Sequence, residues 1–104
     1  MPARERRRGA AAEREVAAIL SDALGTVVQR KLGQARNGGD DIQIGKFRLE
    51  IKRRERISID EWSAQVEACA QSGEVPAVVY RRNGQPWRVA LRLDDFIPLI
   101  REAL

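Results

Sequence analysis

The chain has 104 residues, so we expect a single domain over residues 1–104 with one modest core. Its 19 lysines and arginines outnumber its 15 acidic residues, and the net charge of +4 favours a polyanionic partner. There is no histidine, which excludes Ser-His-Asp and Cys-His catalysis, His-ligated zinc and any histidine base.

The cysteine content and the hydropathy pattern favour a soluble, cytoplasmic protein. Cys69 is the only cysteine, so no disulfide can form within the chain, which is typical of a reducing compartment. Because it is an apolar residue of a predicted helix, we expect it in the core. A basic N-terminal arm at residues 1–8 is followed by no apolar leader, and no run approaches the ~20 residues of a membrane span.

The first part of the chain predicts a helix, a short strand and a loop. Between Gly9 and Leu24 the apolar residues recur at the spacing of one helical face, and Gly25 is a plausible C-cap. A short β-prone run follows at Val27 to Lys31. Residues 34–39 (QARNGG) are typical of a polar, turn-rich loop.

Residues 40–52, DDIQIGKFRLEIK, predict a β-hairpin with one apolar and one charged face. Gly45 is the first central residue of a two-residue type II′ turn, and this turn fixes the register. Asp41 then faces Glu50, and both lie with Lys52 on the charged face. Carboxylates whose Cβ atoms are about 5 Å apart repel each other, and a divalent cation between them would remove this conflict.

The second half of the chain predicts a helix, two strands and a final helix. Ser58 and Glu61 have the spacing of a capping box at the start of a helix. Strands are expected at Ala77 to Arg82 and Trp87 to Leu93, and the tail is expected to be helical around Pro98. The order is α-β-β-β-α-β-β-α, an α/β fold with a central mixed β-sheet flanked by helices.

The charged face of the hairpin has the residues of a phosphodiester hydrolase site. Two carboxylates, a backbone carbonyl and waters are hard oxygen ligands, which suit Mg²⁺ or Mn²⁺ better than zinc. Lys52 lies about 7 Å beyond Glu50 on the same face, where it would orient a metal-bound water or stabilise the transition state. The alternative is a solvated strand face on which the acids pair with Arg48 and Lys52.

One acid of the first helix is a further candidate. At about 100° per residue, Glu13 lies roughly 50° from the centre of the apolar stripe, whereas Glu15 lies roughly 110° from it. An acid that borders the core needs a partner, which favours Glu13. Pairing of Glu13 with Arg14 or another arginine on the surface is the alternative.

These residues resemble the PD-(D/E)xK nuclease superfamily, and within it the Holliday junction resolvases of archaeal and phage type. The segment RGAAAEREVAAIL is similar to the family's opening helix, GGDDIQIGKFRLEIK to its metal-binding hairpin, and VPAVVYRRNGQPWRV to its later strands. The resemblance covers most of the chain. It implies a restriction-endonuclease-like fold and a Mg²⁺-dependent DNA endonuclease that acts in recombination and repair.

The resemblance also assigns roles to residues. By it the site residues would be Asp41, Glu50 and the Ile51 carbonyl as metal ligands, Lys52 as the catalytic lysine, Glu13 as the helix acid and Gln65 as an accessory polar residue. The chain has Gly39-Asp40 where the family pattern has proline, which leaves Asp40 as an alternative to Asp41. Strand parity favours Asp41, because Asp40 would point to the opposite face.

Arginines around the predicted site suggest phosphate contacts with DNA. The candidates are Arg7, Arg8, Arg53, Arg54, Arg81 and Arg82. One chain offers one site, whereas a four-way junction needs two symmetric cuts, so a two-fold homodimer is expected. A nicking or repair nuclease of the same fold and a non-catalytic DNA-binding module are the alternatives.

Overall fold

The computed structural model describes residues 3–28, 30–31 and 41–104. The elements of these residues are α1 (Ala3–Leu24), β1 (Arg30–Lys31), β2 (Asp41–Ile44), β3 (Phe47–Arg53), α2 (Ile59–Cys69), β4 (Val75–Arg81), β5 (Arg88–Ala90) and α3 (Leu93–Ala103). The predicted order of elements is confirmed, and the predicted loop at residues 34–39 lies outside the described residues. None of the described helices is long and apolar enough to cross a membrane.

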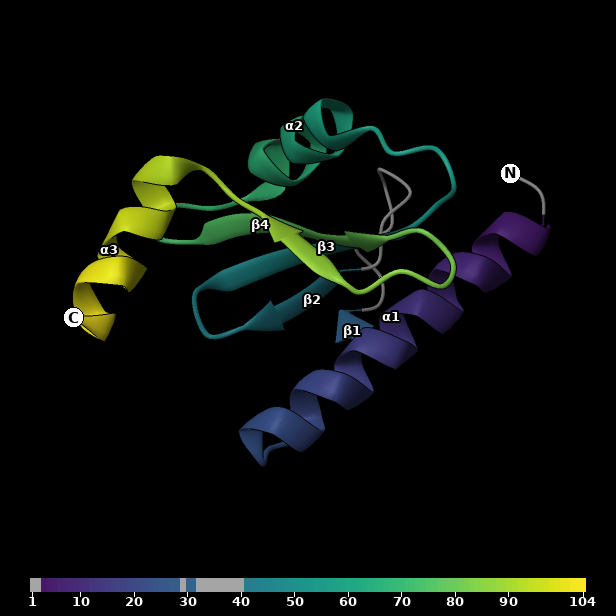
Figure 1. Cartoon of the computed structure of the whole chain (residues 1–104), viewed down its shortest axis with the longest axis horizontal. Coiled ribbons are helices and arrows are strands. Elements are labelled where there is room, and N and C mark those ends of the chain that lie inside the picture. The colour runs from purple at the N-terminus through teal and green to yellow at the C-terminus, as the bar shows by residue number, and fades with distance from the viewer. Residues whose placement is uncertain (1–2, 29, 32–40) are drawn as a thin grey trace.

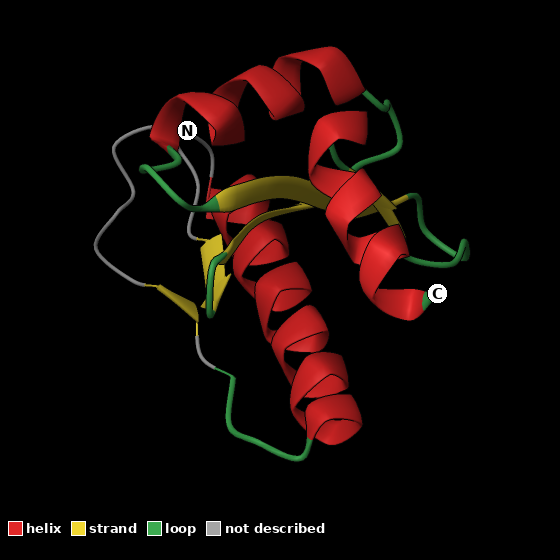
Figure 2. Ribbon diagram, turned by 90° about the vertical axis from the view of Figure 1, so that its left-hand side faces the viewer, coloured by secondary structure: helices red, strands yellow, loops and turns green. Residues whose placement is uncertain are grey.

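The described strands form a mixed sheet in the order β1-β2-β3-β4-β5. β3 and β4 are parallel, because α2 returns the chain to the start of the next strand, and the other neighbours are antiparallel. α1 and α2 lie on opposite sides of the sheet (Figures 1 and 2), while α3 lies at one end of the molecule (Figure 1). The prediction of an α/β fold with a central mixed sheet and flanking helices is confirmed.

Two separate cores cover the two faces of the sheet. Leu49 and Ile51 of β3 belong to the core beneath α1. The core on the other face is built around Trp62 of α2. Because side chains alternate along a strand, Glu50 and Lys52 lie on the α2 side.

Three local predictions differ from the structure. α1 begins at Ala3 rather than Gly9, since arginine is a good helix former and the basic arm continues the helix. Ser58 precedes α2 but makes no side-chain cap hydrogen bond, so the predicted capping box was wrong. Cys69 is exposed, so its predicted place in the core was also wrong, because the buried stripe of α2 ends one turn earlier.

Candidate active site

The hairpin has the predicted register. Asp41 is paired with Glu50, and Gln43 with Arg48, across β2 and β3. Gly45 takes a positive φ of 53°, as the first central residue of a type II′ turn requires, and no non-glycine residue of the described chain does so. The backbone therefore sets Asp41 opposite Glu50, although the Asp41 side chain lies outside the described part.

Glu50 is a buried carboxylate on the α2 side of the sheet. It keeps 8% of its surface exposed and precedes Lys52 by two residues on β3. Its neighbour on β4 is Val78, which is fully buried. A carboxylate at such a place is stable as an anion only beside positive charge or hydrogen-bond donors. A bound divalent cation would supply such a positive charge.

Lys52 lies beside two aromatic residues on the same side of the sheet. Its Nζ atom is 6.0 Å from the centre of the Trp62 ring. Tyr80 is its neighbour on β4, and the rings of Trp62 and Tyr80 are 6.4 Å apart with an angle of 51° between them. Attraction between the ammonium group and the ring face holds the end of the lysine near α2.

Gln65 is half-buried on α2, three residues after Trp62. Its Oε1 atom is buried and has no hydrogen-bond partner among the described residues. A buried amide oxygen without a partner destabilises a protein by about 1–3 kcal/mol. The position therefore suits an oxygen that a water, an ion or a substrate group would contact.

The Ile51 carbonyl points to the β2 side of β3, beyond the last described pair of the hairpin. In a two-residue hairpin the residues that flank the turn exchange backbone hydrogen bonds, and every second residue does so along the ladder. Ile51 continues the series of Phe47 and Leu49, so its carbonyl points to the β2 side of β3. The described pairing ends at Asp41 and Glu50, one residue before Ile51.

The predicted metal ligands are all oxygen atoms. They are the carboxylates of Asp41 and Glu50 and the carbonyl of Ile51, at the open end of the hairpin. Among the side chains that the structure describes, no three acidic or cysteine residues form a group that could hold a metal ion. The donor set, with Asp41 included, fits Mg²⁺ or Mn²⁺ better than zinc.

Glu13 is buried on α1, as predicted. It keeps 4% of its surface exposed, whereas the side chain of Glu15 keeps 35%. The prediction that Glu13 borders the core is therefore confirmed. Because α1 covers the opposite face of the sheet, the structure does not place Glu13 on the same face as Glu50 and Lys52.

Glu15 joins α1 to both central strands. Its carboxylate accepts hydrogen bonds from Arg81 Nη2 at 3.0 Å, from Arg53 Nη1 at 3.3 Å and from the Trp87 indole at 2.7 Å. Partial burial acts to raise the pKa of Glu15, but the Trp87 hydrogen bond and the two guanidinium groups outweigh it and lower the pKa. The Arg81 guanidinium also lies 5.0 Å from the centre of the Trp87 ring.

Sequence reasoning missed this network, although strand parity contained its signal. Arg53 and Arg81 follow Ile51 and Val79 by two residues, so they face α1, and they are neighbours in the β3–β4 register. Two adjacent arginines repel each other and need a shared acid, which Glu15 supplies. Their side chains are only 22% and 15% exposed, so their guanidinium groups mainly bind Glu15 and are largely shielded from solvent.

The other arginines predicted to contact DNA are placed differently. Arg82 is exposed, and its Nε atom donates to the Glu55 carbonyl at 3.0 Å. Arg54 is half-buried and donates to the carbonyl of the preceding residue. The side chains of Arg7 and Arg8 lie outside the described ones.

Arg48 forms an ion pair at the other end of β3. Its Nε atom is 2.9 Å from Glu74 Oε1, which also accepts a hydrogen bond from the Gln71 backbone at 2.8 Å. The Arg48 hydrogen bond, followed by that from Gln71, lowers the pKa of Glu74 to about 2. The pair ties β3 to the turn before β4.

Comparison with known proteins adds a family to this geometry. A family model described as “Phage putative PDDEXK endonuclease” matches residues 4–103. No curated protein and no solved structure matches the chain. Because the family model spans nearly the whole sequence, the chain belongs to this phage PD-(D/E)xK endonuclease family.

Proposed function

We propose that the chain is a Mg²⁺-dependent DNA endonuclease that resolves four-way junctions. The family implies an endonuclease that hydrolyses DNA and a restriction-endonuclease-like fold. The observation that supports the site is the hairpin, in which Asp41 is paired with the buried Glu50 and Lys52 follows on the same face.

The chemistry follows from the residues at the open end of the hairpin. Asp41, Glu50 and the Ile51 carbonyl would hold the Mg²⁺, for which Mn²⁺ can substitute; when bound, the metal supplies a Lewis acid and lowers the pKa of water. Lys52 donates hydrogen bonds to the attacking water or to a phosphate oxygen, and its charge offsets the negative charge that develops on phosphorus. Trp62 limits the directions that the ammonium group can take.

Two further residues have supporting roles in this proposal. The Gln65 amide oxygen, which is buried without a partner among the described residues, would accept a hydrogen bond from water in the site. Glu13, which is buried on α1, would serve as the helix acid of the site and would have to reach it from the other face of the sheet. Phosphate contacts would come from Arg54 and Arg82, which follow the central strands, and from Arg7 and Arg8 near the start of α1. Arg53 and Arg81, which bind Glu15, would add positive charge next to these contacts.

Junction resolution requires two cuts, one on each of two strands of like polarity. A single chain has one hairpin site, so a two-fold dimer is needed to place two sites on one junction. With no aromatic ladder for stacking bases, binding would depend on phosphates, and branch geometry would supply the selectivity.

The test is a cleavage assay with Mg²⁺ on a labelled four-way junction, a flap and a linear duplex side by side. We expect paired symmetric nicks in the junction and little cleavage of the duplex. Lys52→Ala and Glu50→Gln should each reduce cleavage by at least ~100-fold, because each removes a transition-state or ligand contact. Lys46→Ala, which removes an exposed lysine of the same hairpin, is the matched control and should cleave normally.

Two results would contradict the proposal at different points. Normal turnover of Lys52→Ala would show that this lysine is not catalytic. Cleavage of linear duplex as fast as the junction would overturn the resolvase assignment and leave a nicking or repair nuclease of the same fold.

A further inference from the structure

α3 has an apolar face that the rest of the chain leaves exposed. The helix is described in full, and none of its residues is buried. Leu93, Phe96, Ile97 and Ile100 keep 67%, 44%, 41% and 41% of their surface exposed. Isolated helices shorter than about 12 residues are marginal in water, and Pro98 inside α3 removes a backbone hydrogen bond. α3 therefore needs more packing than its own chain provides.

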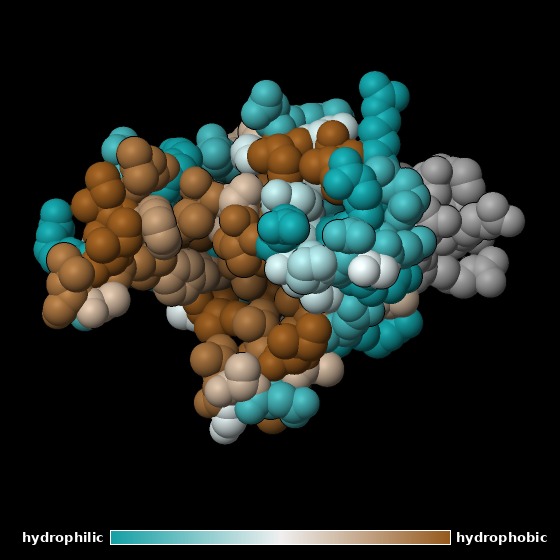
Figure 3. All heavy atoms as spheres, in the orientation of Figure 1, coloured by the Kyte–Doolittle hydropathy of each residue, from teal (hydrophilic) through white to brown (hydrophobic). Residues whose placement is uncertain are grey.

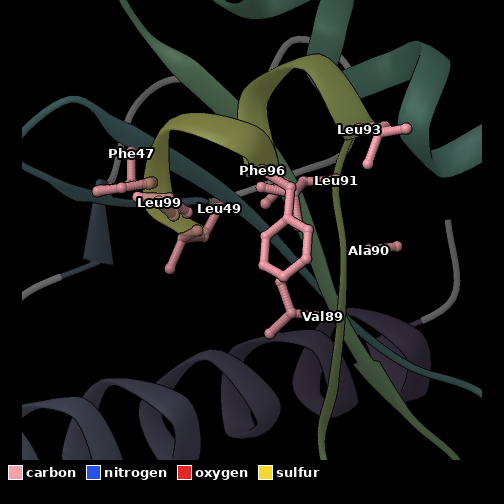
Figure 4. Close-up of a pocket in the computed structure, with 9 residues that line it drawn as sticks. Phe47, Leu49, Val89, Ala90, Leu91, Leu93, Phe96 and Leu99 are labelled. Carbon is pink, nitrogen blue, oxygen red and sulfur yellow. The ribbon is translucent and has the colours of Figure 1, made fainter. Parts of the chain in front are cut away.

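A groove lies between α3 and the sheet. It has a volume of about 530 Å³ and a hydrophobic lining that includes Phe47, Leu49 and Val89 of the sheet. Figure 4 shows Phe96 and Leu99 of α3 pointing into this groove towards the sheet residues. A second hollow of about 220 Å³ against α1 shares Leu49 and Val89 with the groove. The two hollows form a continuous hydrophobic surface.

We call the exposed part of this surface, together with the outer side of α3, the α3 patch. It comprises Ile19, Val89, Leu93, Phe96, Ile97 and Ile100. Figure 3 shows hydrophobic side chains gathered over α3 and continuing across the neighbouring part of the same face.

The size of the α3 patch matches one side of a standard interface. The exposed fractions of its six residues add up to about three whole side chains, on the order of 450 Å² at ~150 Å² each. A standard interface buries about 800 Å² per partner, of which roughly 56–65% is apolar. The patch therefore supplies about the apolar area that one partner contributes.

We infer that the α3 patch binds the α3 patch of a second copy of this chain about a two-fold axis. An interface of this kind must be complementary to itself. The patch meets this condition, because Ile97 and Ile100 line neither hollow and form a ridge on the same helix that borders the groove. The ridge of one copy enters the groove of the other.

The charges around the patch favour a second copy over a polyanion. Two arginines, Arg92 and Arg101, and three acids, Asp94, Asp95 and Glu102, lie in or next to α3, so the charges beside the patch nearly cancel. Figure 1 places α3 and the loops after β3 and β4, with their arginines, at opposite ends of the molecule. Pairing through α3 leaves the basic end of each copy open to DNA.

Sedimentation of the full chain without DNA or metal tests this inference independently of cleavage. The wild-type chain should form a dimer of about 23 kDa, twice the 11.7 kDa of one chain, at micromolar concentration. Ile97→Asp and Ile100→Asp should weaken dimerisation by at least ~100-fold, because each buries a carboxylate at the interface. Val27→Asp, at a residue that is 79% exposed outside the patch, is the matched control and should dimerise normally.

Circular dichroism of each variant separates loss of the dimer from loss of the fold. Should an aspartate variant unfold, the double variant Ile97→Ala with Ile100→Ala gives a milder test, in which the dimer weakens and the spectrum is unchanged. A wild-type chain that stays monomeric at high micromolar concentration, or a folded Ile100→Asp variant that dimerises as the wild type does, would overturn the inference. Neither result bears on whether the hairpin cleaves DNA.

Discussion

The pairing of two acids at the open end of the hairpin predicts opposite effects on stability and on metal binding. Asp41 is paired with Glu50, whose carboxylate is buried. Without a cation, two negative charges in this position destabilise the fold, and burial increases the effect. A divalent metal site needs the same two carboxylates. At this pair we therefore expect a change that removes activity to increase stability.

Asp41→Asn is the change that tests this expectation. It should abolish cleavage and raise the melting temperature of the metal-free protein by about 2–6 °C, because one of two opposed charges is removed. Thermal unfolding in EDTA measures the stability, and Asp60→Asn, which removes an exposed acid of α2, is the matched control. A fall as large as that for a core substitution such as Ile42→Ala would indicate a structural ion pair instead.

Among the elements, the hairpin could be predicted because its information is local. Gly45 selects a two-residue turn, and strand parity then separates the apolar residues from Asp41, Glu50 and Lys52. The observed register is the predicted one. On the first helix, the helical period of about 100° per residue likewise identified Glu13 as the acid that borders the core, and it is buried.

Contacts between distant elements could not be predicted in the same way. The network of Glu15 depends on the β3–β4 register, which brings Arg53 and Arg81 together from segments joined through α2. The capping box at Ser58 failed because the spacing of residue types does not fix the backbone angles that a cap needs. The roles of the hairpin residues in metal binding and catalysis remain predictions.

The ion pair that ties β3 to the turn before β4 predicts a stability change in acid. Hydrogen bonds from the Arg48 guanidinium and, after it, from the Gln71 backbone lower the pKa of Glu74 from its ordinary value of 4.5 to about 2. A lowered pKa adds stability above the unfolded value, so this contribution should be complete above about pH 4.5 and be lost as the pH falls towards 2. Urea unfolding of the wild type and of Glu74→Gln should show midpoints that differ at neutral pH and converge near pH 2.

Glu67→Gln is the matched control for this measurement, because it removes an exposed carboxylate of α2. Its midpoint should follow that of the wild type across the pH range. Midpoints of Glu74→Gln that differ from the wild type equally at neutral and acid pH would show that packing of the side chain, rather than its charge, supports the turn.

At the scale of the whole molecule, the two ends have different surfaces. Arginines lie after β3 and β4 at one end, and the exposed hydrophobic residues of α3 lie at the other (Figures 1 and 3). The first surface suits a phosphate backbone, and the second suits a protein partner. If copies pair through α3, two hairpin sites face outward from one body. Selectivity for branched DNA would then require the dimer, because a single chain has only one site.

This separation predicts how binding and cutting respond to salt and to loss of the dimer. If the arginines contact phosphates as proposed, the logarithm of affinity for any duplex should fall linearly with the logarithm of salt concentration, with a slope of about −0.9 per contact whatever the base sequence. Ile100→Asp should keep this slope per chain. It should still nick DNA, because it leaves the hairpin unchanged. It should lose the paired symmetric cuts in a four-way junction. Cleavage of a plasmid with a supercoiled cruciform shows whether both cuts are made in one binding event. The wild type should convert the plasmid directly to the linear form. The variant should release it as a nicked circle. Paired cuts by a variant that sedimentation shows to be monomeric would mean that the selectivity for branched DNA is built into the single chain.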